Sequence, residues 1–167
     1  MGKAQVLLNK PNSTKYFYPA DDNWEMKLMP MKASTAFAEG AAIGVEVSSN
    51  VTTGNLTLMP ATGATGGHFM GIMAEPVVAA DSDYATAGKL KAIRIPKTNK
   101  ARAYFAVWAG TLAATDVFST VSFHSDSLGL ACDTLGLWAK ITEMLVAGAA
   151  GTGKGICEFS CPITLTA

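Results

Sequence analysis

Charged residues are scarce in this sequence, and their signs cancel. Lys and Arg together number 13, Asp and Glu also number 13, and charged residues make up 16% of the 167 positions. A chain with so little net charge lacks bulk electrostatic attraction to nucleic acid or to an acidic membrane surface. We therefore expect no direct nucleic-acid partner and no membrane partner.

Cysteine is scarce as well, with only Cys132, Cys157 and Cys161. Three thiols cannot all pair within one chain, and so few do not suggest a disulfide scaffold. No apolar run approaches the roughly 20 residues of a membrane-spanning helix, and Met1 to Leu8 lacks the regions of a signal peptide. We expect reduced thiols and synthesis in a cytoplasm.

Hydrolytic motifs are missing. The patterns GxSxG and HExxH do not occur, and the triplet His124 to Asp126 is too local for its side chains to form a catalytic triad. Asp21, Asp22 and Glu25 fall in a proline-rich stretch, where solvated carboxylates are expected rather than acid–base catalysis. These observations favour a protein that is not an enzyme.

A glycine-rich segment, Gly148 to Gly155, comes near to the phosphate-binding loop GxxxxGK[ST]. Gly155 replaces the hydroxyl residue that would hold magnesium, and only twelve residues follow it, with Pro162 among them. That leaves no room for the helix whose N-terminal amides complete such an anion site. We interpret the segment as a hairpin turn and expect no cofactor.

A metal site has some candidate ligands. Cys157 and Cys161 lie four positions apart, and Cys132 with His68 or His124 could complete a set of four. Structural zinc sites usually present ligands in tight CxxC turns, and that pattern does not occur here. We expect buried thiols that act as small apolar side chains and no metal.

Apolar residues are abundant, at 49%, and they occur in short runs separated by glycine, proline and polar turns. Such spacing predicts an all-β fold, an antiparallel β-sandwich or a barrel-like domain. The segment 137–147 has helical spacing at Leu137, Ile141 and Leu145. It also contains the β-branched residues Ile141, Thr142 and Val146, and we favour a strand. The other expected strands are 41–47, 55–59, 68–75, 89–95, 101–108, 117–123, 127–132 and 156–165, with 89–95 and 101–108 paired as a hairpin and 117–123 paired with 127–132.

The segment Ala101 to Trp108 is the most apolar of these strands, and both of its faces are apolar. Phe105 and Val107 point to one side, whereas Tyr104 and Trp108 point to the other. A second sheet could cover one face. We therefore expect a second copy of the chain or a larger partner to cover the other face.

Residues 1–32 differ from the rest of the chain, which suggests an extended N-terminal arm followed by a β domain at 33–167. The arm has prolines, no regular period, and aromatic residues at Tyr16, Phe17, Tyr18 and Trp24. An arm laid on a neighbouring surface would bury these rings. A loop folded back on its own domain is equally consistent with the sequence. We expect interface contacts at Tyr16, Phe17, Tyr18, Trp24, Tyr104 and Trp108, since large aromatic residues dominate interface energies.

Basic residues concentrate between positions 89 and 102. Six of the thirteen occur there: Lys89, Lys91, Arg94, Lys97, Lys100 and Arg102. On a two-stranded hairpin they would form a basic rim that attracts an acidic partner surface. The alternative is a solvated strand edge that discourages aggregation.

Two stretches carry a resemblance to a known family. The first is Gly71 to Asp81 (GIMAEPVVAAD), followed by the apolar strand Lys89 to Pro96; the second is Ala109 to Val117 (AGTLAATDV), followed by Leu128 to Leu130. Their order resembles that of the head decoration, or cement, proteins of tailed bacteriophages. The resemblance implies a β-rich protein on the capsid surface of the virion, synthesised in the host cytoplasm, without catalytic residues. It also implies the major capsid protein and copies of the chain itself as partners, typically in a trimer.

The leading hypothesis is therefore a non-enzymatic virion structural protein that decorates and stabilises a bacteriophage capsid through apolar strand and arm contacts. A phage tail-tube or head–tail connector subunit is an alternative. A carbohydrate-binding β-sandwich module is an alternative of another class.

Overall fold

The computed structural model describes residues 16–46, 55–59, 67–124, 127–136 and 139–159. Strands dominate this part of the chain, and its one helical element is a short 3-10 turn, η2 (Ala114–Asp116). The expected all-β class is confirmed. Within these ranges, no helix has the length and apolar character needed to cross a membrane.

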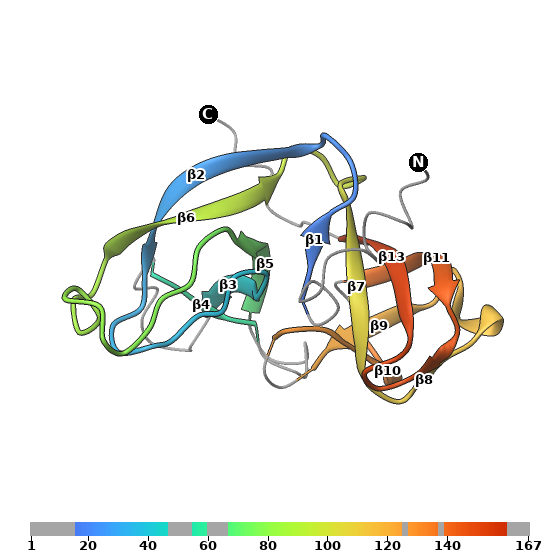
Figure 1. Cartoon of the computed structure of the whole chain (residues 1–167). Helices are drawn as coiled ribbons and strands as arrows, with labels where there is room; N and C mark the ends of the chain where they lie inside the picture. The colour runs from blue at the N-terminus through green and yellow to red at the C-terminus, as the bar shows by residue number, and fades with distance from the viewer. Residues whose placement is uncertain (1–15, 47–54, 60–66, 125–126, 137–138, 160–167) are drawn as a thin grey trace.

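The first unit is a closed five-stranded barrel in the order β2-β4-β3-β5-β6. Its strands are β2 (Trp24–Met31), β3 (Ala42–Glu46), β4 (Leu56–Leu58), β5 (Gly67–Met73) and β6 (Lys89–Pro96). β2 and β6 run antiparallel over their whole length and form the long curved ribbon in Figure 1. Alternate side chains point inward, and Met31, Ile43, Leu56, Met73 and Ile93 are fully buried there.

The second unit is a six-stranded mixed sheet in the order β1-β7-β10-β9-β11-β13. Its strands are β1 (Tyr18–Pro19), β7 (Arg102–Ala109), β9 (Thr120–Phe123), β10 (Leu130–Leu135), β11 (Ala139–Val146) and β13 (Lys154–Phe159), and a small pair, β8 (Thr111–Leu112) with β12 (Gly148–Ala149), lies beside them. β7 pairs with both β10 and β13, so five strands of this sheet close into a ring.

An aromatic cluster joins the two units. Phe69 of the barrel stacks on Phe159 of the sheet with ring centroids 4.3 Å apart, and Phe17 contacts Phe123 and Phe159 edge-on at 5.6 and 5.5 Å. All four rings are almost completely buried. Edge-on and stacked rings are favourable arrangements in addition to the area they bury. The two units therefore share this aromatic core, whereas the side chains inside the barrel form a separate core.

The structure corrects the predicted arm for the residues it describes. Tyr18 pairs with Tyr104, β2 is a full strand of the barrel, and the Lys32 amide donates to Leu56 O at 2.9 Å. No boundary therefore separates residues 16–32 from the domain. Pro30, one of the prolines of the predicted arm, is accommodated because β2 has β6 on one side and pairs with β4 only at Met31. Residues 1–15 lie outside the described ranges.

Each predicted strand overlaps an observed one, and the prediction of a strand at 137–147 is confirmed by β11. The predicted bounds are less accurate, because β9 begins three residues and β10 three residues later than expected. Residues 47, 137–138 and 160–165 of the predicted strands lie outside the described ranges. β9 and β10 pair antiparallel as expected. The prediction that 89–95 and 101–108 pair as a hairpin is wrong. β6 pairs with β2 and β5 in the barrel. β7 pairs with β1, β10 and β13 in the other sheet. In the turn between them the chain therefore crosses from the barrel to the other sheet, as it crosses in the opposite direction between β1 and β2.

Candidate protein-binding surfaces

Strand β7, the predicted interface strand, is covered on both faces by the chain itself. Phe105 and Val107 are 2% and 1% exposed inside the ring of strands. On the other face Tyr104 is 6% exposed and packs with Ala20 and Ile156. The expectation that a neighbouring molecule must cover this strand is wrong, because β1 and β13 flank β7 and their side chains supply the cover.

Trp108, at the end of β7, is half-buried, and its ring centroid lies 5.6 Å from that of His124. Gly129 lies directly against the indole, because a Cβ built at that position would overlap the Trp108 side chain. Because position 129 has no side chain, the indole can lie against the backbone just before β10. Of the two predicted contact residues on β7, Tyr104 is therefore buried and Trp108 is half-buried.

The four aromatic residues of the predicted arm have different environments. Phe17 is 1% exposed and belongs to the core, so the prediction that it contacts a partner is wrong. Trp24 is half-buried, donates from its indole nitrogen to Arg102 O at 3.0 Å and meets the Phe159 ring at 5.9 Å. Tyr16 and Tyr18 are half-buried as well, but they form one wall of an open cleft.

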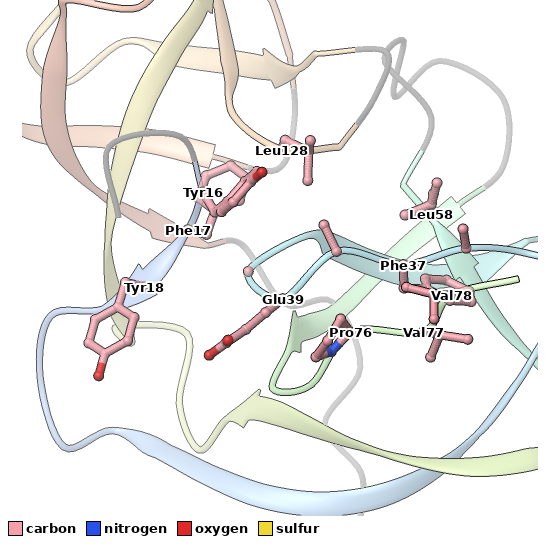
Figure 2. Close-up of a pocket in the computed structure, with 13 residues that line it drawn as sticks. Tyr16, Phe17, Tyr18, Phe37, Glu39, Leu58, Pro76, Val77, Val78 and Leu128 are labelled. Carbon is pink, nitrogen blue, oxygen red and sulfur yellow. The ribbon is translucent and has the colours of Figure 1, made fainter. Parts of the chain in front are cut away.

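That cleft has a volume of about 720 Å³ and lies between the start of the described chain and the barrel (Figure 2). Tyr16 to Tyr18 form one wall, and the other comes from the segments 36–40 and 76–78 with Leu58 and Leu128. Reciprocal backbone hydrogen bonds between Phe37 and Val77, at 3.0 and 2.8 Å, hold the two segments together. The result is a preformed apolar hollow of the size of a typical ligand site.

One charged side chain lines the cleft among the described residues, that of Glu39. Its carboxylate pairs with the Arg94 guanidinium at 3.5 Å and stays 55% exposed. Arg94 also donates to Met73 O at 3.3 Å and lies over the Tyr18 ring, 5.6 Å from its centroid. These contacts fix the carboxylate at the cleft while leaving it accessible to solvent.

Large exposed apolar side chains gather on the outer side of the β2–β6 ribbon. Met26 and Leu28 are each 63% exposed and Leu90 is 60% exposed. The register places Leu28 opposite Ala92 and Pro30 opposite Leu90, so these side chains share one face. We call Met26, Leu28 and Leu90 the ribbon face. Other exposed large apolar residues are Val78 at the cleft, Phe118 and Leu135.

The six basic residues do not form one continuous rim. Lys89 is 5% exposed and donates to Tyr84 O at 2.6 Å, while Lys97 donates to Asp22 O at 3.2 Å and Lys100 is exposed. The remaining three form ion pairs: Lys91 with Asp83 at 3.1 Å, Arg94 with Glu39 at 3.5 Å and Arg102 with Glu143 at 3.2 Å. The hydrogen bond to Asp83 raises the pKa of Lys91 above its usual value. Three of the six basic side chains thus already form ion pairs with acidic residues of the same chain.

The cysteines that the structure describes are poorly suited to nucleophilic chemistry. Burial raises the pKa of the Cys132 thiol to about 12, with Asp116 and Asp133 adding to the effect. Burial raises the pKa of the fully buried Cys157 even further. Both thiols are therefore protonated at neutral pH and inert. No three His, Cys, Asp or Glu side chains gather as a metal site in the described ranges, which leave out Cys161 and the His68 side chain.

The glycine-rich segment is a turn, as expected. Gly148 belongs to β12, the chain reverses at residues 150–152, and Lys154 begins β13. The Gly153 amide donates to Ala149 O at 2.9 Å, and Gly151 adopts a φ of +81°. A strand follows the glycines in place of the helix that a phosphate-binding loop needs. The triplet His124 to Asp126 is described only at His124.

Sequence reasoning missed the ribbon face and Phe118. A signal for the ribbon face was present, because Met26 and Leu28 alternate with Glu25 and Lys27 as on a half-exposed strand. Its interpretation as an irregular arm hid the alternation. No comparable pattern marks Phe118.

The comparisons with known proteins add no relatives. No protein-family model matches the sequence, and neither a curated protein nor a solved structure matches it significantly.

Proposed function

We propose that this chain is a non-enzymatic virion structural protein that decorates and stabilises a bacteriophage capsid, and that the ribbon face contacts the shell. The observation that carries the proposal is the exposure of Met26, Leu28 and Leu90 on two strands that pair with each other along their whole length. Large apolar side chains grouped on a rigid element are typical of a protein contact. Because the strands are already ordered, little conformational entropy would be lost on binding.

The size of this face limits the strength of one contact. Complete burial of its three side chains would contribute roughly 3 to 6 kcal/mol before the cost of association, which is itself of order 4 kcal/mol or more. A single copy would therefore bind weakly through this face alone. Several linked copies on a repeating surface would bind far more tightly, since each later contact is intramolecular. A homo-oligomer on a regular shell fits this arithmetic.

The sequence resemblance supports a phage capsid as that surface. Its first stretch runs from β5 through the turn at residues 74–81 and continues in β6, which carries Leu90 of the ribbon face. Its second stretch covers β8 and η2 in the other unit. The resemblance therefore includes part of the surface that we assign to shell binding.

Co-sedimentation with empty shells of the major capsid protein from the same phage tests the proposal. Leu28→Asp places a charge in the ribbon face, and the fraction bound should fall by about tenfold or more, because burying an unpaired carboxylate costs well over 1.4 kcal/mol. Leu135→Asp is the matched control, since Leu135 is 87% exposed and belongs to the other unit. Wild-type protein that stays in the supernatant, or equal loss in both variants, would contradict the assignment.

A further inference from the structure

Phe118 is held in an exposed position by a strained backbone. It follows η2, has a φ of +75° and is 70% exposed. A bulky residue rarely adopts positive φ, and such strain persists only where the surrounding structure enforces it. Here the Phe118 amide donates to Ile141 O at 2.7 Å, which fixes the turn. The ring is thereby presented to solvent.

A cation accompanies this ring. The Lys140 ammonium lies 5.6 Å from the ring centroid of Phe118, and Lys140 is exposed. We call Phe118 and Lys140 the knob. Its turn protrudes at the right end of the molecule in Figure 1, whereas β1, which carries one wall of the cleft, lies in the centre.

The cleft has the complementary properties, and we call it the socket. It is apolar, has a volume of about 720 Å³ and is bordered by Val78, which is 49% exposed. Its one charged lining side chain in the described ranges is acidic, that of Glu39, and Figure 2 shows it between Tyr18 and Pro76. The Glu39 carboxylate pairs with Arg94 at 3.5 Å but is 55% exposed, so it can also accept a second cation. An aromatic ring with an attached cation therefore matches this hollow in both polarity and charge.

We propose that the knob of one copy inserts into the socket of a second copy, with Phe118 in the apolar cleft and Lys140 facing Glu39. The two surfaces lie on different parts of the chain, so the contact is heterologous. One copy uses its knob and keeps its socket, whereas the other uses its socket and keeps its knob. Repetition of such a contact produces a closed ring where the rotation closes and an open chain where it does not. This self-association uses neither Met26, Leu28 nor Leu90 and does not depend on shell binding.

Sedimentation of two single variants, alone and mixed, tests the arrangement. Phe118→Asn removes the ring, and Asn tolerates positive φ, so the melting temperature should stay the same or rise while self-association is lost. Val78→Lys blocks the socket and repels Lys140. Each variant alone should be monomeric, but an equal mixture should form a dimer, because one variant retains a socket and the other retains a knob. An interface between identical patches would give no such rescue.

Charge reversal gives a second measurement. Lys140→Glu and Glu39→Lys should each weaken self-association. Mixing the two variants should restore assembly to the wild-type size, because both contacts between unlike copies then bring opposite charges together. Leu90→Lys is the matched control, because Leu90 is an exposed apolar residue that pairs with Pro30, away from the knob and socket, and the variant should leave association unchanged. Wild-type protein that is monomeric at about 1 mM, where even a millimolar complex is populated, would overturn the proposal. So would a Phe118→Asn variant that associates like wild type. Neither outcome bears on shell binding, which Leu28→Asp tests separately.

Discussion

Strand β7 and the β2–β6 ribbon both carry large apolar side chains, but the chain covers only one of them. From Ala103 to Val107, every residue of β7 is buried, although both faces of the strand are apolar. On the ribbon, Met26, Leu28 and Leu90 are more than half exposed. An uninterrupted apolar run therefore indicated burial within the chain, whereas apolar residues alternating with charges marked the surface that stays accessible.

Topology explains the difference. β7 has strand neighbours on both edges, and the ring closed by β13 and β10 encloses its inner side chains. β2 has β6 along one edge but meets β4 only at Met31, and the ribbon arches over β3, β4 and β5 in Figure 1. No second layer of described residues covers Met26 or Leu28. A strand is thus exposed or buried according to its place in the sheet, which its own residues do not specify.

The largest expected effect comes from removing a side chain of β7. Phe105→Ala should lower the free energy of unfolding by about 3 to 5 kcal/mol, because it leaves a cavity inside the ring of strands. Chemical denaturation monitored by circular dichroism measures the loss. A loss below about 1 kcal/mol would mean that β7 is not covered by its own chain, and the contrast with the ribbon would disappear.

A smaller effect is expected where Trp108 rests on Gly129. A Cβ at position 129 would overlap the indole and would lie 2.6 Å from Ala106 O, so Gly129→Ala should cost about 1 to 3 kcal/mol. Most of this overlap is between the added Cβ and the Trp108 side chain. Trp108→Leu in the same background should therefore recover part of the loss, and a double-mutant cycle by denaturation measures that coupling. Strictly additive effects would show that the indole does not lie against this glycine.

Much of the fold follows from the sequence because period-two patterns and turn residues are local. The strand at residues 139–146 was predicted correctly although Leu137, Ile141 and Leu145 fall at helical spacing. Pairing is not local. The hairpin predicted for β6 and β7 failed because the chain crosses between units after Pro96, and no residue in that turn specifies its direction.

The candidate surfaces were predictable only in part, for the same reason. Tyr16 and Tyr18 were identified as contact residues, and both line the cleft, but its other wall comes from segments that begin at Ala36 and extend to Leu128 in the sequence. Phe118 lay in a segment expected to be a strand from residue 117. The strand begins at Thr120, and the positive φ of Phe118 arises from contacts with β11 that the sequence does not display.

The smallest effect on stability is expected on the ribbon, at Leu28. Leu28→Thr keeps β propensity and removes apolar surface that is already 63% exposed, so the free energy of unfolding should stay within about 0.5 kcal/mol. Retention on a hydrophobic-interaction column should fall, because the variant exposes less apolar area to the matrix. A loss of 2 kcal/mol or more would mean that Leu28 is buried within a single copy. The ribbon would then resemble β7, and its outer face would no longer be available to a shell.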